Sequence, residues 1–482
     1  MHEVRRQCGA TDLDRELVRQ IRRSHVVGRV RGIAVGVMML LAASGYLFGG
    51  AIMTQQIASA GPPNGTELRA TEASMAQAQA TVRPIATSAS TARINLTSNG
   101  LSSSGKAFSY GYDLAQQGPY DGKGPVSDSA RQVAQSISGA FEDVPIMGWG
   151  LPNPEPSPGI YDLSGIAQRV AFVESTGGIP IITLCAAPDW MKGGQLGSTD
   201  WTQIDTAPLP QHFEDFAALT ALIARTFPQV KYFVVWNELK GFWNSSIDGW
   251  DAESYTDLYN DVYTAIKAVR PDALVGGPYV SMTTDPGSAP AMQAAPSGSW
   301  GYVDPAPLAA VSYWLRHNVG ADFIAVDGSG FTESAGLATD PLTATQKYAA
   351  VDDWLRAQTS LPIVWMESHL LPDPTTATQQ QQAALRVAVL LQMASSGASV
   401  GMQWNPEQTP GWDEGLWTAT DAIGGGQATV LAQELPAVLA VLAAPVSLVG
   451  GEPPGRMAAS GPDGTITVTL SPTTASVVTQ TS

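Results

Sequence analysis

Two glutamates that follow apolar segments are the residues of this chain best suited to acid–base chemistry. Glu238 ends the run "YFVVWNE", and Glu367 lies at the end of "PIVWMES". In each case a tryptophan stands two positions before the glutamate. A carboxylate adds nothing to the burial of a hydrophobic strand. For one such glutamate, a plain surface-loop carboxylate is the alternative; the repeated pattern favours a chemical role for both.

The segments around these glutamates predict a (β/α)8 TIM barrel over residues 105–445. Eight apolar runs read as strands buried on both faces, and each is followed by an amphipathic, helix-like stretch. The rival, a doubly wound open sheet, usually carries a glycine-rich phosphate loop, and no G-x-G-x-x-G or P-loop occurs. The predicted strands are 107–114, 144–150, 179–188, 232–238, 273–280, 322–330, 362–368 and 398–405, and the predicted helices are 127–141, 163–176, 210–227, 253–269, 307–318, 343–358, 378–396 and 428–444.

The spacing of the two glutamates predicts that they meet at one rim of this barrel. They lie 129 residues apart, which corresponds to three strand–helix units. Since the carboxyl ends of all eight strands form one face, both side chains should look across its mouth. Retaining glycoside hydrolysis needs two such carboxyl groups about 5–5.5 Å apart: one protonates the leaving oxygen, and the other attacks the anomeric carbon.

Several motifs resemble the retaining glycoside hydrolases of clan A, and most of all family 39, the β-xylosidase and exopolysaccharide-hydrolase family. They are "WNE" on the fourth strand, the glutamate on the seventh, the segment 159–191 and a tryptophan on the eighth strand. The resemblance implies that Glu238 is the acid/base, that Asn237 binds the sugar 2-hydroxyl and that Glu367 is the nucleophile. It also implies that Trp404 is the aromatic floor of the sugar site.

The chain departs from the clan pattern at two places near these residues. Leu239 stands where a proline usually follows the acid/base, and the sixth strand ends in "VDGSG", where relatives often carry His or Tyr. Asp327 in that segment is predicted to bind a sugar hydroxyl or to take over the His/Tyr position.

Three further aromatic residues at predicted strand ends are candidate substrate-binding residues. Trp190 is placed to stack on a sugar face, or else closes the core as a loop aromatic. Tyr279 is placed to bond either the nucleophile or a sugar hydroxyl. Tyr112, at the end of the first strand, is the third candidate.

The amino-terminal part of the chain predicts attachment to a membrane. Residues 1–31 hold eight arginines and four acidic residues, and residues 32–53 hold no charge. Such a run spans a bilayer, and the arginines predict a cytoplasmic N-terminus with the rest of the chain outside. The alternative is a signal peptide cleaved near Ala60, which would release a secreted protein. Residues 54–104 are predicted to be a flexible linker.

Composition narrows the partners and cofactors. A net charge of −17 argues against a nucleic-acid partner, because the phosphate backbone would repel so acidic a protein. Two cysteines give no disulfide framework, and no metal-ligand motif occurs, so neither metal nor cofactor is expected. The carboxyl-terminal residues 446–482 are predicted to form a small β hairpin around a Pro-Asp-Gly turn.

These observations predict a membrane-anchored retaining β-glycosidase that acts on an extracytoplasmic polysaccharide or oligosaccharide. Two alternatives stay open. A non-catalytic glycan-binding barrel would keep the groove, although such proteins usually lose one of the two carboxylates. A transglycosylase would share the covalent intermediate and pass the sugar to another sugar.

Overall fold

A computed structural model describes residues 108–114, 124–285, 295–332, 336–337, 340–369, 377–408, 414–452 and 454–482. The predicted basic segment 1–31, membrane span 32–53 and linker 54–104 lie outside these residues. Within the described ranges, no helix is both long and apolar enough to cross a bilayer.

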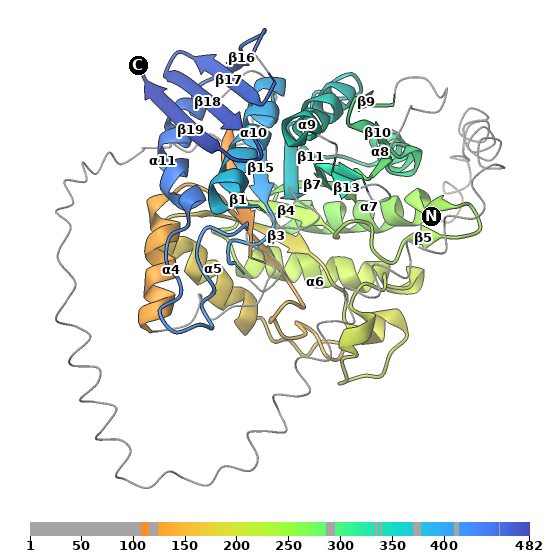
Figure 1. Ribbon diagram of the computed structural model, residues 1–482. Helices are drawn as coiled ribbons and strands as arrows, with labels where there is room; N and C mark the ends of the chain where they lie inside the picture. The colour runs from red at the N-terminus through yellow and green to blue at the C-terminus, as the bar shows by residue number, and fades with distance from the viewer. Residues whose placement is uncertain are drawn as a thin grey trace, which may run out of the picture. The chain divides into compact units, whose positions relative to one another are not determined.

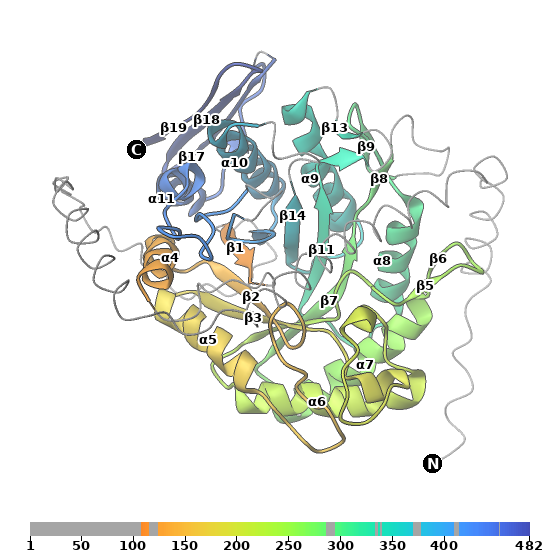
Figure 2. The same cartoon turned by 60° about the horizontal axis from the view of Figure 1, so that its bottom comes forward.

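Eight parallel strands close into the predicted barrel. Hydrogen bonding runs around it in the order β1-β15-β14-β11-β7-β4-β3-β2 and returns to β1. Figure 2 shows these strands inside a ring of helices. The strands are β1 (Ser109–Asp113), β2 (Phe141–Pro145), β3 (Ile179–Leu184), β4 (Tyr232–Val235), β7 (Leu274–Ser281), β11 (Phe323–Ser329), β14 (Ile363–His369) and β15 (Val400–Gln403).

A helix follows each barrel strand, as a repeated strand–helix unit requires (Figure 1). Side-chain caps fix several helix starts, for instance the capping box of Thr378 and Gln381 at α10. The helices are α4 (Pro125–Ser136), α5 (Ser164–Thr176), α6 (Phe213–Thr226), α7 (Ala252–Val269), α8 (Pro305–His317), α9 (Pro341–Arg356), α10 (Gln379–Ser396) and α11 (Val430–Leu442).

Alternation along the strands divides the core into two parts. One set of side chains fills the barrel interior, and it includes Phe141, Ile181, Tyr232, Phe323 and Met402. The opposite set packs between the strands and the surrounding helices. Burial on both faces explains why these strands read as continuous apolar runs in the sequence.

The second strand and the helix before it were predicted too late in the chain. The sequence favoured a helix over 127–141 and a strand over 144–150, whereas α4 ends at Ser136 and β2 begins at Phe141. The cause is the acidic pair Glu142 and Asp143, which interrupts the apolar pattern although both side chains are buried.

The predicted carboxyl-terminal hairpin is two strands of a larger sheet. β17 (Arg456–Gly461) and β18 (Gly464–Leu470) pair antiparallel around the predicted turn. β16 (Ser447–Leu448) and β19 (Ala475–Thr481) extend this pair to four strands. The sheet packs against α10 and α11, and that contact supplies the apolar burial that an isolated hairpin lacks.

Candidate active site

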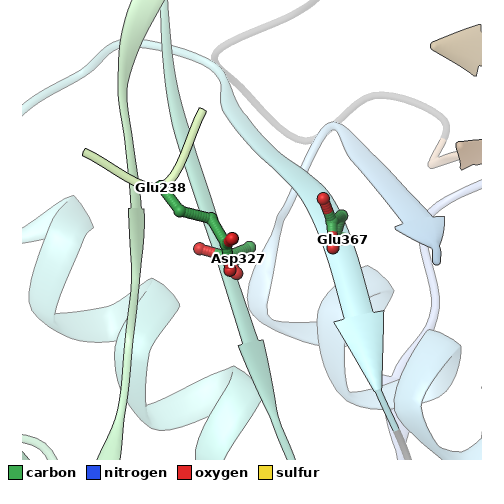
Figure 3. Close-up of side chains that lie close together, drawn as sticks. All are labelled: Glu238, Asp327 and Glu367. Atoms are coloured by element: carbon green, nitrogen blue, oxygen red, sulfur yellow. The ribbon is translucent and has the colours of Figure 1, made fainter. Parts of the chain in front are cut away.

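Three carboxyl groups from separate strands meet at the carboxyl-terminal end of the barrel. Glu238 follows β4, Asp327 lies on β11, and Glu367 lies on β14. One oxygen from each lies within 4.8 Å of the other two, and Figure 3 shows the three side chains together. We call these residues the carboxyl cluster. The structure thus brings Glu238 and Glu367 together, as the sequence predicts, and adds Asp327 between them.

Three oxygens at this spacing also fit a divalent cation, which prefers carboxylate ligands. Among the described residues, this is the group of acidic, His and Cys side chains whose ligand atoms lie close enough for that. The sequence predicts no metal at this site.

The backbone around Glu238 has an unusual conformation that explains its sequence. Trp236, Glu238 and Leu239 have φ values of 69°, 51° and 52°. This left-handed conformation costs residues other than glycine about 1–2 kcal/mol each. The buried Trp236 indole donates to Lys240 O over 2.7 Å and so closes the turn. Proline has φ near −65° and cannot occupy position 239, which accounts for the leucine there.

This turn also brings a lysine onto the candidate acid/base. Lys240 Nζ lies 2.6 Å from Glu238 Oε2 and 5.7 Å from the centre of the Trp149 ring. Burial raises the pKa of Glu238, but the Lys240 charge and a hydrogen bond with Asp327 outweigh burial and lower that pKa to about 2.

The surroundings of Asp327 shift its pKa in the opposite direction from that of Glu238. Asp327 is 1% exposed, and no residue that the structure describes bonds its Oδ1 atom. Burial, followed by the charges of Glu238 and Glu367, raises the pKa of Asp327 well above its usual range. When three carboxyl groups share so small a volume, they cannot all be ionised. Of the three carboxyl groups, Asp327 is therefore the one whose surroundings most favour the protonated form.

Glu367 is almost fully buried, and two neighbouring side chains hold its carboxylate. It is 6% exposed. The Tyr279 hydroxyl donates to Glu367 Oε1 over 2.5 Å, and His369 Nε2 lies 3.3 Å from Oε2. A carboxylate held in this way has a fixed direction of attack, which a nucleophile requires.

Replacing Tyr279 with phenylalanine should lower kcat/KM about 10–100-fold, because a hydrogen bond to a charged group contributes roughly 1.5–3 kcal/mol. The loss should be similar for good and poor leaving groups, since positioning of Glu367 matters in both. Tyr263→Phe on α7, outside the barrel, is the matched control and should leave kcat/KM unchanged. Equal activity of Tyr279→Phe and the intact protein would contradict this role.

An arginine that could have been noticed in the sequence supports the end of β14. Arg386 on α10 donates to Ser368 Oγ and Ser368 O over 2.5 and 2.9 Å, directly after Glu367. It also pairs with Glu414 over 2.8 Å, and the two side chains are 1% and 2% exposed. An arginine within the apolar run "AALRVAVLL" of this helix is the signal that could have indicated it.

Replacing Arg386 with methionine should destabilise the fold by about 3–5 kcal/mol, because Glu414 would stay buried without its partner. Chemical denaturation measures this difference. The control is Arg131→Met, which removes a solvent-exposed pair with Asp128 and should cost less than about 1 kcal/mol. Similar losses of stability in both variants would show that the buried ion pair contributes no more to folding than the exposed one.

The other predicted site residues lie at different depths. Asn237 is 6% exposed, and its Oδ1 atom has no hydrogen-bond partner in the described part of the chain. A ligand hydroxyl would satisfy that atom. Trp404 is partly buried beside His369, with ring centres 5.5 Å apart. Asn237 directly precedes Glu238 in the chain, and Trp404 lies beside His369, which contacts Glu367.

Trp190 and Tyr112 serve packing in the structure. The Trp190 indole donates to Glu155 O over 2.9 Å, and its ring meets His212 edge-on. Tyr112 is 0% exposed, lies in the core between strands and helices, and packs edge-on against Trp417. The structure does not place Tyr112 at the barrel mouth, because its side chain alternates with Asp113, which points inward.

Two further buried acids near the mouth were not among the predicted site residues. Asp113 and Asp143 are register partners on β1 and β2, each 2% exposed. Both charges act on Tyr279. Burial raises the pKa of Asp143 to about 7, with the Glu367 charge adding to it and the Thr183 hydroxyl opposing it. The second strand was predicted to begin at residue 144, so Asp143 fell outside it and was not expected at the site.

Comparison with known proteins gives the same architecture. A family 39 glycoside hydrolase from Bacteroides cellulosilyticus WH2 is 15% identical, with 76% of this chain and 71% of that chain covered at a TM-score of 0.50. A monomeric β-xylosidase from Caulobacter crescentus CB15 is 18% identical, with 76% and 73% covered at a TM-score of 0.49. No protein-family model and no curated protein matches the chain.

At these identities the likeness concerns the fold. The chain is a (β/α)8 barrel whose solved structural neighbours include a glycoside hydrolase of family 39. The resemblance predicted from "WNE" and the strand-7 glutamate is thereby confirmed for the architecture.

Proposed function

We propose that the chain is a retaining glycoside hydrolase that cleaves β-glycosidic bonds by double displacement. The observation that carries this proposal is the approach of Glu238 and Glu367 from β4 and β14, with carboxylate oxygens within 4.8 Å. Inverting enzymes keep their two carboxyl groups roughly 6.5–9.5 Å apart to admit a water, whereas retaining enzymes keep them about 5–5.5 Å apart. Oxygens within 4.8 Å leave less room than an inverting enzyme needs, which supports the retaining arrangement.

Each residue then has a defined task. Glu367, oriented by Tyr279, attacks the anomeric carbon and forms a covalent glycosyl ester. Glu238 delivers a proton to the departing oxygen and later takes one from the attacking water. Asn237 binds the sugar 2-hydroxyl through its unpartnered Oδ1 atom, and Trp404 supports the sugar ring.

The test is turnover of aryl β-glycosides and of cell-envelope polysaccharides by the full chain, with the configuration of the first product read by NMR. Retention at the anomeric carbon supports double displacement. An inverted product would exclude it. Saturable glycan binding without turnover would favour the non-catalytic barrel, and sugar–sugar products would favour the transglycosylase.

We further propose an extracytoplasmic substrate. The support is the arginine-led uncharged run at residues 32–53, for which the positive-inside rule predicts a cytoplasmic N-terminus and an external barrel. Protease accessibility of the barrel in intact cells tests the orientation. Protection of the barrel until the cells are lysed would contradict it.

A further inference from the structure

The carboxyl cluster contains one acid more than double displacement uses. Asp327 reaches the same volume as Glu238 and Glu367, from a different strand. Figure 3 shows its carboxyl group beside that of Glu238. A residue that only bound a sugar hydroxyl would not need to contact Glu238. The contact between the two carboxyl groups therefore indicates a role for Asp327 in proton transfer.

The ion pair with Lys240 creates a difficulty for Glu238. A general acid must hold a proton before the leaving oxygen departs. At 2.6 Å from Glu238 Oε2, the Lys240 ammonium favours the ionised form of that carboxylate. Glu238 therefore needs a nearby proton donor that Lys240 does not touch.

Resting on the proposed function, we propose that Asp327 is a catalytic residue that stores the proton and passes it through Glu238 to the leaving oxygen. Before the reaction the carboxyl cluster carries one exchangeable proton, with Asp327 as the store and Glu238 as the residue that delivers it. In the covalent intermediate that proton has left, and the ester on Glu367 removes one negative charge in its place.

The charges balance in both halves of the reaction. As Glu367 bonds to the anomeric carbon, the bond to the leaving oxygen breaks and that oxygen keeps the electron pair. It receives a proton from Glu238, which receives one from Asp327. Glu367 has lost its charge in the ester, and Asp327 has gained one. In the second half water attacks the anomeric carbon, its proton returns through Glu238 to Asp327, and Glu367 leaves as a carboxylate.

The setting of Asp327 suits proton storage. It is buried, and its Oδ1 atom has no partner among the residues described. The charged and titratable groups around the cluster come from several elements: Glu238 and Lys240 after β4, Tyr279 on β7, Glu367 and His369 on β14, Lys347 and Tyr348 on α9, and Asp113 and Asp143 on β1 and β2. Of the positive side chains, Lys240 contacts Glu238, Lys347 Nζ donates to Ser329 O, and Arg386 on α10 is paired with Glu414.

The decisive variant is Asp327→Asn, which keeps the shape but cannot release a proton. Two aryl glycosides of one sugar are compared, with 2,4-dinitrophenol and with phenol as leaving groups. For the phenyl glycoside, kcat/KM should fall about 100-fold, within the usual range for general acid catalysis. For the dinitrophenyl glycoside, which needs no protonation, it should change less than about threefold. That retained activity also shows that the variant is folded.

The pH profile gives a second readout. In the intact protein, kcat/KM for the phenyl glycoside falls with rising pH only when the stored proton is lost from Asp327. In Asp327→Asn the proton must sit on Glu238 beside Lys240, so this basic limb should move to lower pH. Adding Lys240→Met should move the limb back and recover part of the lost rate, because the charge that ionises Glu238 is gone.

The outcomes separate the two proposals. Equal slowing of both glycosides with a raised KM would make Asp327 a sugar-binding residue and overturn the proton store. Failure of Lys240→Met to recover any rate would overturn the link between Lys240 and Asp327. An intact protein inactive on both glycosides and on all polysaccharides would instead remove the proposed function.

Discussion

Replacement of Glu367 by glutamine is expected to reduce turnover of every glycoside by roughly 10⁴-fold or more, the scale on which loss of a covalent nucleophile slows other enzymes. Glutamine keeps the size of the side chain and can still accept the Tyr279 hydrogen bond. It cannot form a glycosyl ester at a useful rate. Good and poor leaving groups should therefore suffer alike, which distinguishes this substitution from changes at Glu238 or Asp327.

A fluorinated sugar with a good leaving group tests the same role by covalent labelling. Fluorine slows breakdown of the ester more than its formation, so the intermediate accumulates. Peptide mass spectrometry of the intact protein should find the label on Glu367, and Glu367→Gln should take up none. A label on Glu238 or Asp327 would assign the nucleophile to another member of the carboxyl cluster.

Most of the barrel could be predicted from the sequence because its strands are buried on both faces. The apolar runs of β4, β11 and β14 differ clearly from the polar loops beside them. The end of each strand is therefore predicted where apolar residues give way to polar ones. The second strand was predicted too late in the chain because Glu142 and Asp143 are buried acidic side chains, which no hydrophobic pattern indicates. Their burial depends on partners from distant segments, such as Thr176 and Thr183.

The candidate site was predicted in part for a similar reason. The meeting of Glu238 and Glu367 follows from strand order alone, since parallel strands end on one face. The contact of Lys240 with Glu238 depends on the left-handed backbone at Glu238 and Leu239, and no propensity predicts that conformation for such residues. Tyr112 shows the converse error: a residue near a strand end can face the helices.

Replacement of Glu238 by alanine is expected to lower kcat/KM about 10²–10⁴-fold for poor leaving groups, the usual contribution of general acid catalysis. Dinitrophenyl glycosides should form the covalent intermediate at a nearly normal rate. Its hydrolysis should then be slow, because no base activates the water, and a burst of dinitrophenol should precede a slow steady state.

Azide should restore the slow step, and the structure gives a reason particular to this chain. Without the Glu238 side chain, Lys240 loses the carboxylate 2.6 Å from its Nζ atom, and an anion can occupy the space beside that positive charge. The product should be a glycosyl azide with the configuration of the substrate. Glu238→Gln, which fills the space, is the matched control and should respond far less to azide. Azide activation of Glu367→Gln in place of Glu238→Ala would reverse the two assignments, because rescue with retained configuration requires the nucleophile to be intact.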